Sequence, residues 1–246
     1  MKVLGVIPAR YNSSRFPGKP LAKIDGKSMI ERVFFQSKKS NRLTDLIVAT
    51  DDIRIAKHVR EFGGKAMLTS DKHLTGTERC NEVISKLTSH YDIIINIQGD
   101  EPLLDPKQIS EIIELFKKDE VKIGTLARKI YSIEDLLNKN IVKIKFDKDM
   151  SVKSFKRVVF LKEKPPVLNK KKLFYQHVGI YAYRYSILGK ICKLLPTKNE
   201  QINNLEQLRW LDNNYSIYAG ITKNNSYSVD APEDIKKIEQ IIRDFT

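Results

Sequence analysis

The chain has 246 residues, of which 41% are hydrophobic and 30% are charged, and its formal net charge is +14. A chain of this size and composition can build one large α/β domain, alone or with a smaller lobe. Its two cysteines are isolated, which argues against a disulfide framework or a zinc site. No apolar run approaches the roughly 20 residues of a membrane span, so we expect a cytoplasmic protein without membrane insertion.

Strand-like and helix-like segments alternate along the first half of the chain. Short apolar runs predict strands at residues 3–7, 46–50, 65–68 and 92–97. Apolar residues at helical spacing predict helices at residues 29–37, 53–62, 78–87 and 106–118. This alternation favours a parallel sheet with helices on both faces.

The alternation ends near Ile123. Strands are predicted at residues 124–130, 142–146, 152–161 and 178–183, helices at 187–195 and 205–213, and a last helix from Pro232. We therefore predict a doubly wound first half and a mixed second half, with residues 162–172 as a mobile loop.

Three cations lie in the loop after the first predicted strand: Arg10, Arg15 and Lys19. This loop leaves the carboxyl end of the strand, where open α/β sheets bind ligands. Ser13 and Ser14 allow backbone N–H groups to approach an anion, and Arg and Lys side chains suit phosphate oxygens. The loop is neither a P-loop nor a GxGxxG motif. We interpret it as a polyphosphate site, with a basic surface turn as the alternative.

Carboxylates follow the strand predicted at residues 92–97, in the sequence QGDEP. Asp100 is a natural Mg²⁺ ligand there, because Mg²⁺ takes one or two carboxylates and completes its shell with phosphate oxygens and water. Asp105 instead has the position of a helix cap. Asp230, in the sequence VDAPED, also precedes a predicted helix. Its local sequence favours a helix N-cap, with a second metal carboxylate as the alternative.

The sequence LTGTERC enters the helix predicted at residues 78–87. Thr75 and Gly76 form a polar turn that suits hydrogen bonds to a base edge. A threonine cap with Glu78 in the first helical turn explains the same residues. The local sequence leaves both interpretations open.

Six segments together resemble one family. PARYNSSRFPGKPL, TGTER, NIQGDEP, HVGIYAYR, LEQLR and VDAPED occur in this order, and the chain resembles the 3-deoxy-manno-octulosonate (Kdo) cytidylyltransferases, or CMP-Kdo synthetases. The resemblance runs from Val3 to Ile235. The first segment recurs in other sugar nucleotidyltransferases, whereas TGTER, QHVGIYAYR and LEQLR are more specific to the Kdo family.

The resemblance implies a Rossmann-like, doubly wound, mostly parallel sheet of the nucleotidyltransferase type. It implies one domain, 1–246, with a smaller mixed α+β lobe over about residues 124–225. The implied reaction converts CTP and Kdo into CMP-Kdo and pyrophosphate, with Mg²⁺ as the cofactor. Matched segment by segment, the implied CTP-binding residues are Arg10, Ser13, Arg15, Lys19, Thr75, Gly76 and Arg79. The implied metal ligands are Asp100 and Asp230, which with Lys19 are the implied catalytic residues.

The resemblance also implies a sugar pocket. Its matching positions are Gln98, His177, Tyr181, Glu206 and Gln207, with Arg157 as the candidate for the sugar carboxylate. Taken singly, the histidine has a structural role as its alternative, and the helical Glu and Gln have a surface role. Period two puts His177, Gly179 and Tyr181 on one face of a strand. A homodimer with contacts from the lobe, and a role in lipopolysaccharide biosynthesis, are further implications.

The middle of the chain departs from the family pattern. Where the family has an aromatic residue, Ser and Arg followed by Ile-Pro, this chain has Phe155, Lys156 and Arg157 without Ile-Pro. A related sugar acid, such as 8-amino-Kdo or a sialic-acid-like sugar, is therefore the alternative substrate.

Residues 143–172 carry eleven Lys or Arg and three Asp or Glu. A non-enzymatic nucleic-acid-binding protein would use this segment, but it holds no recognised RNA or DNA motif, and a solvated lysine-rich surface also explains it. We expect no nucleic-acid partner.

Overall fold

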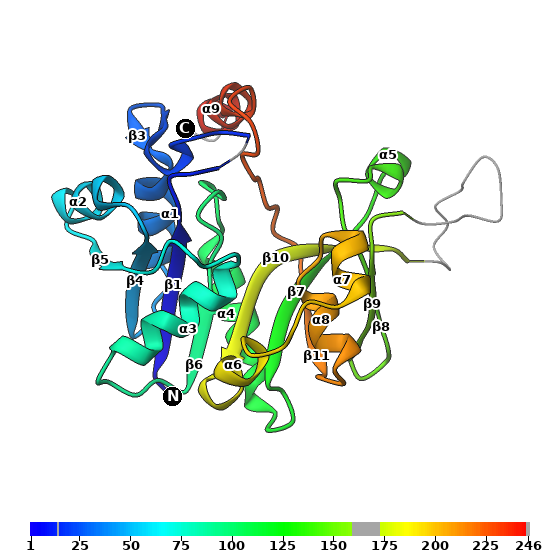
Figure 1. The fold of residues 1–246 in the computed structure, drawn as a ribbon. Coiled ribbons are helices and arrows are strands. Elements are labelled where there is room, and N and C mark those ends of the chain that lie inside the picture. The colour runs from blue at the N-terminus through cyan, green and yellow to red at the C-terminus, as the bar shows by residue number, and fades with distance from the viewer. Residues whose placement is uncertain (14, 159–172, 245–246) are drawn as a thin grey trace. The chain divides into compact units, whose positions relative to one another are not determined.

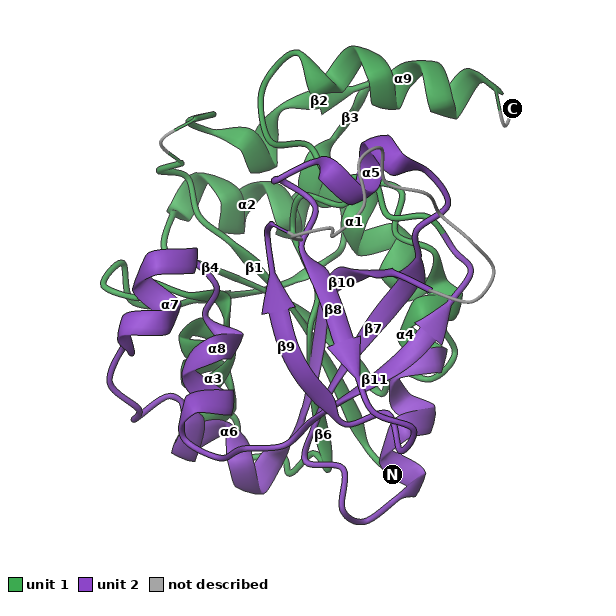
Figure 2. Ribbon diagram, turned by 90° about the vertical axis from the view of Figure 1, so that its right-hand side faces the viewer, with its two compact units in different colours: residues 1–110, 225–246 green, residues 111–224 purple. Residues whose placement is uncertain are grey.

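The structure is a computed structural model that describes residues 1–13, 15–158 and 173–244. It divides into two compact units, of which unit 1 is Met1–Ser110 with Asn225–Thr246 and unit 2 is Glu111–Asn224 (Figure 2). Ser14 and the loop predicted at residues 162–172 lie outside the described residues. No helix in the described part of the chain is long and apolar enough to cross a membrane.

Unit 1 is built on a parallel sheet (Figure 1). Its strands run in the order β6 (Ile93–Asn96), β1 (Val3–Ala9), β4 (Asp45–Thr50) and β5 (Lys65–Leu68). The strands β1, β4 and β6 are almost entirely buried, which explains their continuous apolar sequences. Because neighbouring parallel strands end at one edge, the loops after β1 and β6 leave the sheet next to each other.

Helices follow the strands of unit 1 at α1 (Met29–Lys38), α2 (Ile53–Glu61), α3 (Gly76–Lys86) and α4 (Pro106–Glu114). Two of them begin with a capping box, in which Ser28 pairs with Glu31 and Thr75 pairs with Glu78. Each box satisfies backbone N–H groups that the first helical turn leaves unpaired. The sequence therefore fixes where α1 and α3 begin.

A short hairpin and the last helix, α9 (Asp234–Asp244), pack together in unit 1. The hairpin joins β2 (Lys23–Ile24) to β3 (Lys27–Ser28) through two residues at positive φ, Asp25 and Gly26. This geometry suits a two-residue hairpin turn. A buried cluster of Ile24, Met29, Val229 and Ile238 then holds the segment before α9 against unit 1.

Unit 2 contains a mixed sheet. The strand β7 (Ile123–Lys129) pairs parallel with β11 (Ile217–Thr222) and antiparallel with β10 (Tyr175–Arg184). The strand β8 (Lys143–Phe146) pairs antiparallel with β10 and with β9 (Val152–Lys156). The remaining elements are short: η2 (Leu115–Lys117), α5 (Ile133–Leu137), α6 (Tyr185–Ile191), α7 (Lys198–Asn203) and α8 (Gln207–Asp212).

The predicted fold class, a mostly parallel α/β sheet with a mixed second region, is confirmed. Several predicted bounds are wrong. The strand predicted at residues 152–161 ends at Lys156, and its last three predicted residues lie outside the described ones. The helix predicted at 187–195 ends at Ile191. The elements β2, β3, α5, α7 and β11 were not predicted.

Candidate active site

The cation-rich loop of unit 1 runs from the end of β1 to the 3₁₀ helix η1 (Lys19–Leu21). The carbonyl oxygen of Tyr11 closes it, because it accepts hydrogen bonds from Ser13 N at 3.1 Å and Gly18 N at 2.8 Å. Arg10 and Arg15 are exposed. Arg10 makes no hydrogen bond or ion pair with the residues that the structure describes, so its charge is available to a ligand.

Lys19 contacts the first predicted metal carboxylate. Its Nζ lies 2.7 Å from Asp100 Oδ2 and also donates to the carbonyl oxygen of Val229 at 2.7 Å. The two side chains are only 15% and 28% exposed, so the attraction between them is screened less than at an open surface. The carboxyl end of β6 thus meets the cation-rich loop.

Asp230 lies beside this pair. Its Oδ1 accepts a hydrogen bond from Arg15 Nη2 at 2.8 Å, and Val229 N donates to the carbonyl oxygen of Asp100 at 2.9 Å. Asp230 does not adjoin the last helix, because α9 begins at Asp234, whose Oδ2 accepts hydrogen bonds from the backbone N–H groups of residues 230 and 231. The Asp230 carboxylate is therefore directed at the cation-rich loop, and its role as a metal ligand stays a prediction.

The two carboxylates suit Mg²⁺ in their donor chemistry. Among the described residues, no group of three or more His, Cys, Asp or Glu side chains is arranged to hold a metal ion. Two carboxylates, Asp100 and Asp230, are as many as proteins usually contribute to a Mg²⁺ site. Phosphate oxygens and water usually fill the other coordination positions of the ion. Burial, and then the charge of Asp100, raise the pKa of the neighbouring Glu101 to about 7.

Gly99 sets the spacing between β1 and Asp100. A Cβ atom at this position would lie 2.7 Å from the carbonyl oxygen of Pro8, which belongs to the backbone of β1. We expect Gly99→Ala to lower the free energy of unfolding by about 2 kcal/mol, because backbone must move to admit the methyl group. Urea unfolding measures this loss. An unchanged midpoint would contradict the close approach of the two backbones.

The TGTER segment, residues 75–79, begins the helix α3 in unit 1. Thr75 caps α3, and a Cβ on Gly76 would lie 3.0 Å from Asn96 Nδ2, so the turn lies tightly over the end of β6. Arg79 is 3% exposed, and its guanidinium donates to Thr69 Oγ1, to the carbonyl oxygen of Ser70 and to Asp51 Oδ2. All three contacts are within unit 1, so the Arg79 side chain ties α3 to the segments that follow β4 and β5 rather than extending into solvent.

In unit 2, His177 and Tyr181 lie together on β10. The register places His177 opposite Ala127 and Tyr181 opposite Thr125, with an irregularity between residues 178 and 181. Two more residues on β10 than on β7 therefore form a bulge that contains Gly179. The rings of His177 and Tyr181 lie 5.2 Å apart. The predicted shared face is present, but the bulge, not a regular period of two, produces it.

Thr125 fixes the protonation of His177. The threonine Oγ1 lies 3.0 Å from His177 Nε2 and also contacts the carbonyl oxygens of residues 178 and 180. A hydroxyl has one hydrogen to donate, and the carbonyls can only accept, so Nε2 carries a hydrogen and donates to Oγ1. His177 Nδ1 is left as an acceptor. Sequence analysis missed Thr125, since no local pattern marks it.

The same site predicts a pH dependence of stability. Burial lowers the pKa of His177 to about 3 from its ordinary value of 6.5. Between about pH 6.5 and pH 3, His177 is therefore protonated in the unfolded chain but not in the folded chain. The free energy of unfolding falls over this range as the pH falls. We expect this residue to contribute a slope of up to about 1.4 kcal/mol per pH unit. Unfolding of His177→Asn between pH 6 and 4 should lack this contribution; equal slopes would contradict it.

Tyr181 offers a second polar group. Its Oη is buried and has no hydrogen-bond partner among the described residues. Burial, and then the charge of Glu206, raise the pKa of this phenol well above its ordinary value, so it remains a donor. Glu206 directly precedes α8, and Gln207, in its first turn, is buried. The structure thus gathers Tyr181 and Glu206, while Gln98 belongs to unit 1.

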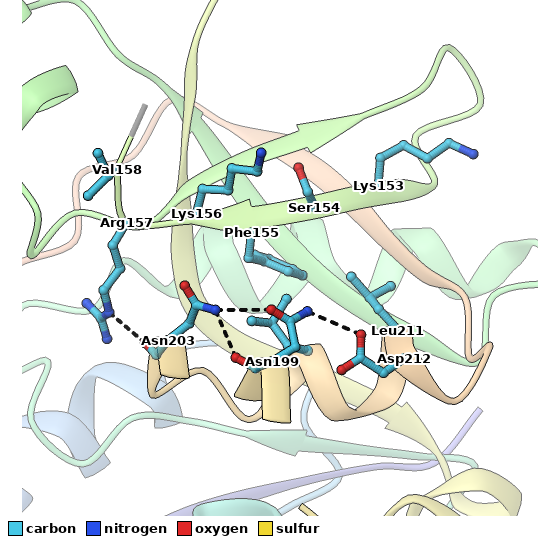
Figure 3. A pocket seen from close by; sticks show the side chains of 11 residues that line it. Lys153, Ser154, Phe155, Lys156, Arg157, Val158, Asn199, Asn203, Leu211 and Asp212 are labelled. Carbon is cyan, nitrogen blue, oxygen red and sulfur yellow. Dashed lines mark hydrogen bonds between the residues drawn. The ribbon is translucent and has the colours of Figure 1, made fainter. Parts of the chain in front are cut away.

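Arg157 has other partners. Its guanidinium donates to the carbonyl oxygens of Asn203 at 2.9 Å, Asn204 at 3.4 Å and Lys139 at 3.5 Å. It lines a pocket of about 490 Å³ between β9 and the helices α7 and α8. Figure 3 shows Phe155 directed toward these helices and Lys156 directed away from them. In this structure Arg157 therefore caps the carboxyl end of α7.

Comparison with known proteins identifies the family of this chain. A sequence model of the family described as cytidylyltransferase matches residues 4–241. A 3-deoxy-manno-octulosonate cytidylyltransferase of Fusobacterium nucleatum is 44% identical over 245 residues, which cover 99% of this chain and 98% of the relative. Another, of Parabacteroides distasonis, is 43% identical over 249 residues and 96% of each chain.

The solved structure of a CMP-2-keto-3-deoxy-manno-octonic acid synthetase complexed with CTP has a TM-score of 0.91 to this chain. The two are 33% identical, and the match covers 100% of both chains. These findings confirm the resemblance seen in the sequence segments. The chain belongs to the cytidylyltransferase family, and within it to the 3-deoxy-manno-octulosonate cytidylyltransferases.

Proposed function

We propose that this nucleotidyltransferase transfers CMP from CTP to the anomeric hydroxyl of Kdo and releases pyrophosphate. The observation that carries the proposal is the pairing in unit 1 of two loop cations with two carboxylates, Lys19 with Asp100 and Arg15 with Asp230. The loop suits a polyphosphate, and the carboxylates suit the Mg²⁺ ion that accompanies it.

In this mechanism the cations exchange partners when CTP binds. Lys19 and Arg15 leave their carboxylates for phosphate oxygens, with Arg10 and Ser13 as further phosphate contacts. Asp100 and Asp230 are then free to hold Mg²⁺. The metal would neutralise phosphate charge and favour loss of the proton from the attacking hydroxyl. The sugar oxygen forms a bond to the α-phosphorus as the bond to pyrophosphate breaks, a reaction that depends on alignment and charge neutralisation.

The turn at Thr75 and Gly76 is proposed to bind the cytidine. The hydrogen bonds of the Arg79 side chain to residues 51, 69 and 70 weaken its predicted role as a direct CTP contact. On the sugar side, His177 Nδ1 is proposed to accept a hydrogen bond from a sugar hydroxyl, and Tyr181 Oη to donate one. Glu206, Gln207 and Gln98 are the other proposed sugar contacts. Arg157 would have to break its hydrogen bonds to the end of α7 in order to reach a sugar. These bonds therefore weaken its predicted role as the ligand of the sugar carboxylate.

The test is pyrophosphate release from CTP and Mg²⁺ with Kdo, 8-amino-Kdo and sialic acid, each with a metal-free control. Mg²⁺-dependent release that is fastest with Kdo is expected. Release with another acid alone would keep the CTP site and assign the altered segment at Phe155–Arg157 to sugar choice. Release with none of the acids would overturn the reaction. Binding of the same protein to an oligonucleotide, with a steep salt dependence, would instead favour the nucleic-acid alternative.

We also propose a homodimer with contacts from unit 2. The segment that ends in α5 exposes three apolar side chains, with Tyr131 at 72%, Leu137 at 53% and Ile133 at 38%. Apolar residues gathered in this way favour a protein interface. Light scattering after size-exclusion chromatography distinguishes the dimer from a monomer of 28.4 kDa.

A further inference from the structure

Tyr11 stabilises the cation-rich loop between β1 and η1, the proposed phosphate loop, through contacts that do not involve Arg10, Arg15 or Lys19. The carbonyl oxygen of this residue already closes the loop through Ser13 N and Gly18 N. The side chain adds a second constraint. A Cβ on Gly18 would lie 3.2 Å from Tyr11 Cζ and Oη, and Gly18 has a φ of +72°. The position next to Lys19 thus requires glycine both for its backbone conformation and for its contact with the tyrosine ring.

A cation lies over the same ring. The Cζ atom of Arg54 is 3.5 Å from the centroid of the Tyr11 ring, well inside the range of a cation–π contact. Arg54 is itself held by Asp52, with Nε to Oδ1 at 3.0 Å and Nη2 to Oδ2 at 2.6 Å. This contact to Asp52 is the main reason that the pKa of Arg54 is raised. A flat, bidentate pair therefore presents the guanidinium face to the ring.

Asp52 is anchored in turn by α2. Its Oδ1 accepts from Arg54 N at 2.8 Å, and Asp52 is the N-cap of that helix. A continuous series of contacts therefore runs from α2 through Asp52, Arg54 and Tyr11 to Gly18. Tyr11, Asp52 and Arg54 were not among the predicted site residues, and all four residues lie in unit 1.

We propose that Tyr11 is a positioning residue of this enzyme, clamped by Arg54 so that the loop is preformed for the CTP phosphates. This inference rests on the proposed function, since it assigns the loop to CTP. The clamp acts through the backbone of Gly18 and Lys19 and does not itself touch phosphate. A preformed loop lowers the entropic cost of binding, so its loss weakens binding of CTP more than it slows the chemical step.

The test measures the Kd for CTP with Mg²⁺ by calorimetry, kcat at saturating CTP, and hydrogen exchange of the loop amides. Tyr11→Leu is expected to weaken CTP binding about fivefold, with kcat changed by less than about twofold. Its amides at Ser13 and Gly18 should exchange faster than in the unmodified protein. Tyr11→Phe keeps the ring and should restore both readouts.

Arg54→Leu removes the other partner of the cation–π contact at an exposed position. It tests the same interaction if Tyr11→Leu fails to fold. The double variant should bind CTP no more weakly than either single variant, because both remove one interaction. Tyr185→Leu is the matched control, since Tyr185 is a partly exposed tyrosine of unit 2, and it should leave CTP binding and the exchange of the loop amides unchanged.

Additive losses in the double variant, or unchanged binding and exchange in Tyr11→Leu, would overturn the clamp. Failure of the unmodified protein to bind CTP would overturn the proposed function instead. The exchange rates of Ser13 and Gly18 would then decide by themselves whether Tyr11 and Arg54 hold the loop.

Discussion

Asp100→Asn is expected to lower kcat about 10³-fold while leaving the fold intact. The substitution keeps the size of the side chain but removes the negative charge that is proposed to hold Mg²⁺. It also breaks the 2.7 Å ion pair with Lys19 Nζ. Since Asp100 follows the end of β6 and lies outside the buried strand, the sheet does not depend on its charge.

The measurement is pyrophosphate release at saturating CTP and Kdo over a range of Mg²⁺ concentrations. Asp105→Asn is the matched control, because Asp105 lies on the same loop but uses Oδ1 to accept a hydrogen bond from Lys107 N at the start of α4. We expect the control to retain its turnover. Activity of Asp100→Asn close to that of the unmodified protein at high Mg²⁺ would remove Asp100 from the metal site.

Lys19→Gln is expected to have two effects of opposite sign. It should lower kcat/KM for CTP, and the loss corresponds to about 2–4 kcal/mol of transition-state stabilisation, because the leaving pyrophosphate loses a neutralising charge. It should also tighten binding of Mg²⁺ to the nucleotide-free protein about tenfold, because Asp100 is released from its ion pair and the repulsion between Lys19 and the metal disappears.

Calorimetric titration with Mg²⁺ in the absence of CTP separates these effects. Arg15→Gln provides the comparison, because the Arg15–Asp230 pair is 69% and 50% exposed and should influence metal binding much less. Lys23→Gln controls for a general change in charge, since Lys23 is an exposed residue of β2. If Lys19→Gln binds Mg²⁺ no more tightly than Lys23→Gln does, the exchange of partners proposed for CTP binding is wrong.

The fold of unit 1 could be predicted because its signals are local. Buried strands such as β6 read as apolar runs, and the capping boxes at Ser28 and Thr75 mark helix starts within four residues. The strand β11 escaped prediction because Ala219 and Gly220 dilute its apolar pattern, and its pairing with β7 involves residues far away in the sequence. The helices α5 and α7 contain five and six residues, too few to show a helical period.

The sequence could indicate which residue types form the candidate site, but it could not show which of these residues contact each other. Local sequence could favour Asp100 as a metal ligand, yet for Asp230 it favoured a helix cap. The contact between Asp230 and Arg15 spans 215 positions, so only the folded chain reveals it. The same limit applies to Arg79 and Arg157. A charged side chain in a matching segment does not disclose that its hydrogen bonds are made within the protein.

Unit 1 is assembled from both ends of the chain, and this has a consequence for biosynthesis. Residues 1–110 carry the phosphate loop and all four strands of the parallel sheet, but Val229 and Asp230 are translated only after the whole of unit 2. A nascent chain that has reached unit 2 therefore has Arg15 without its carboxylate partner and Lys19 without its second acceptor. A prematurely terminated product would retain a cationic loop but lack one of the two proposed metal ligands, and the proposed mechanism predicts that it would not turn over nucleotide. The order of segments along the chain thus delays completion of the proposed metal site until the whole of unit 2 has been translated.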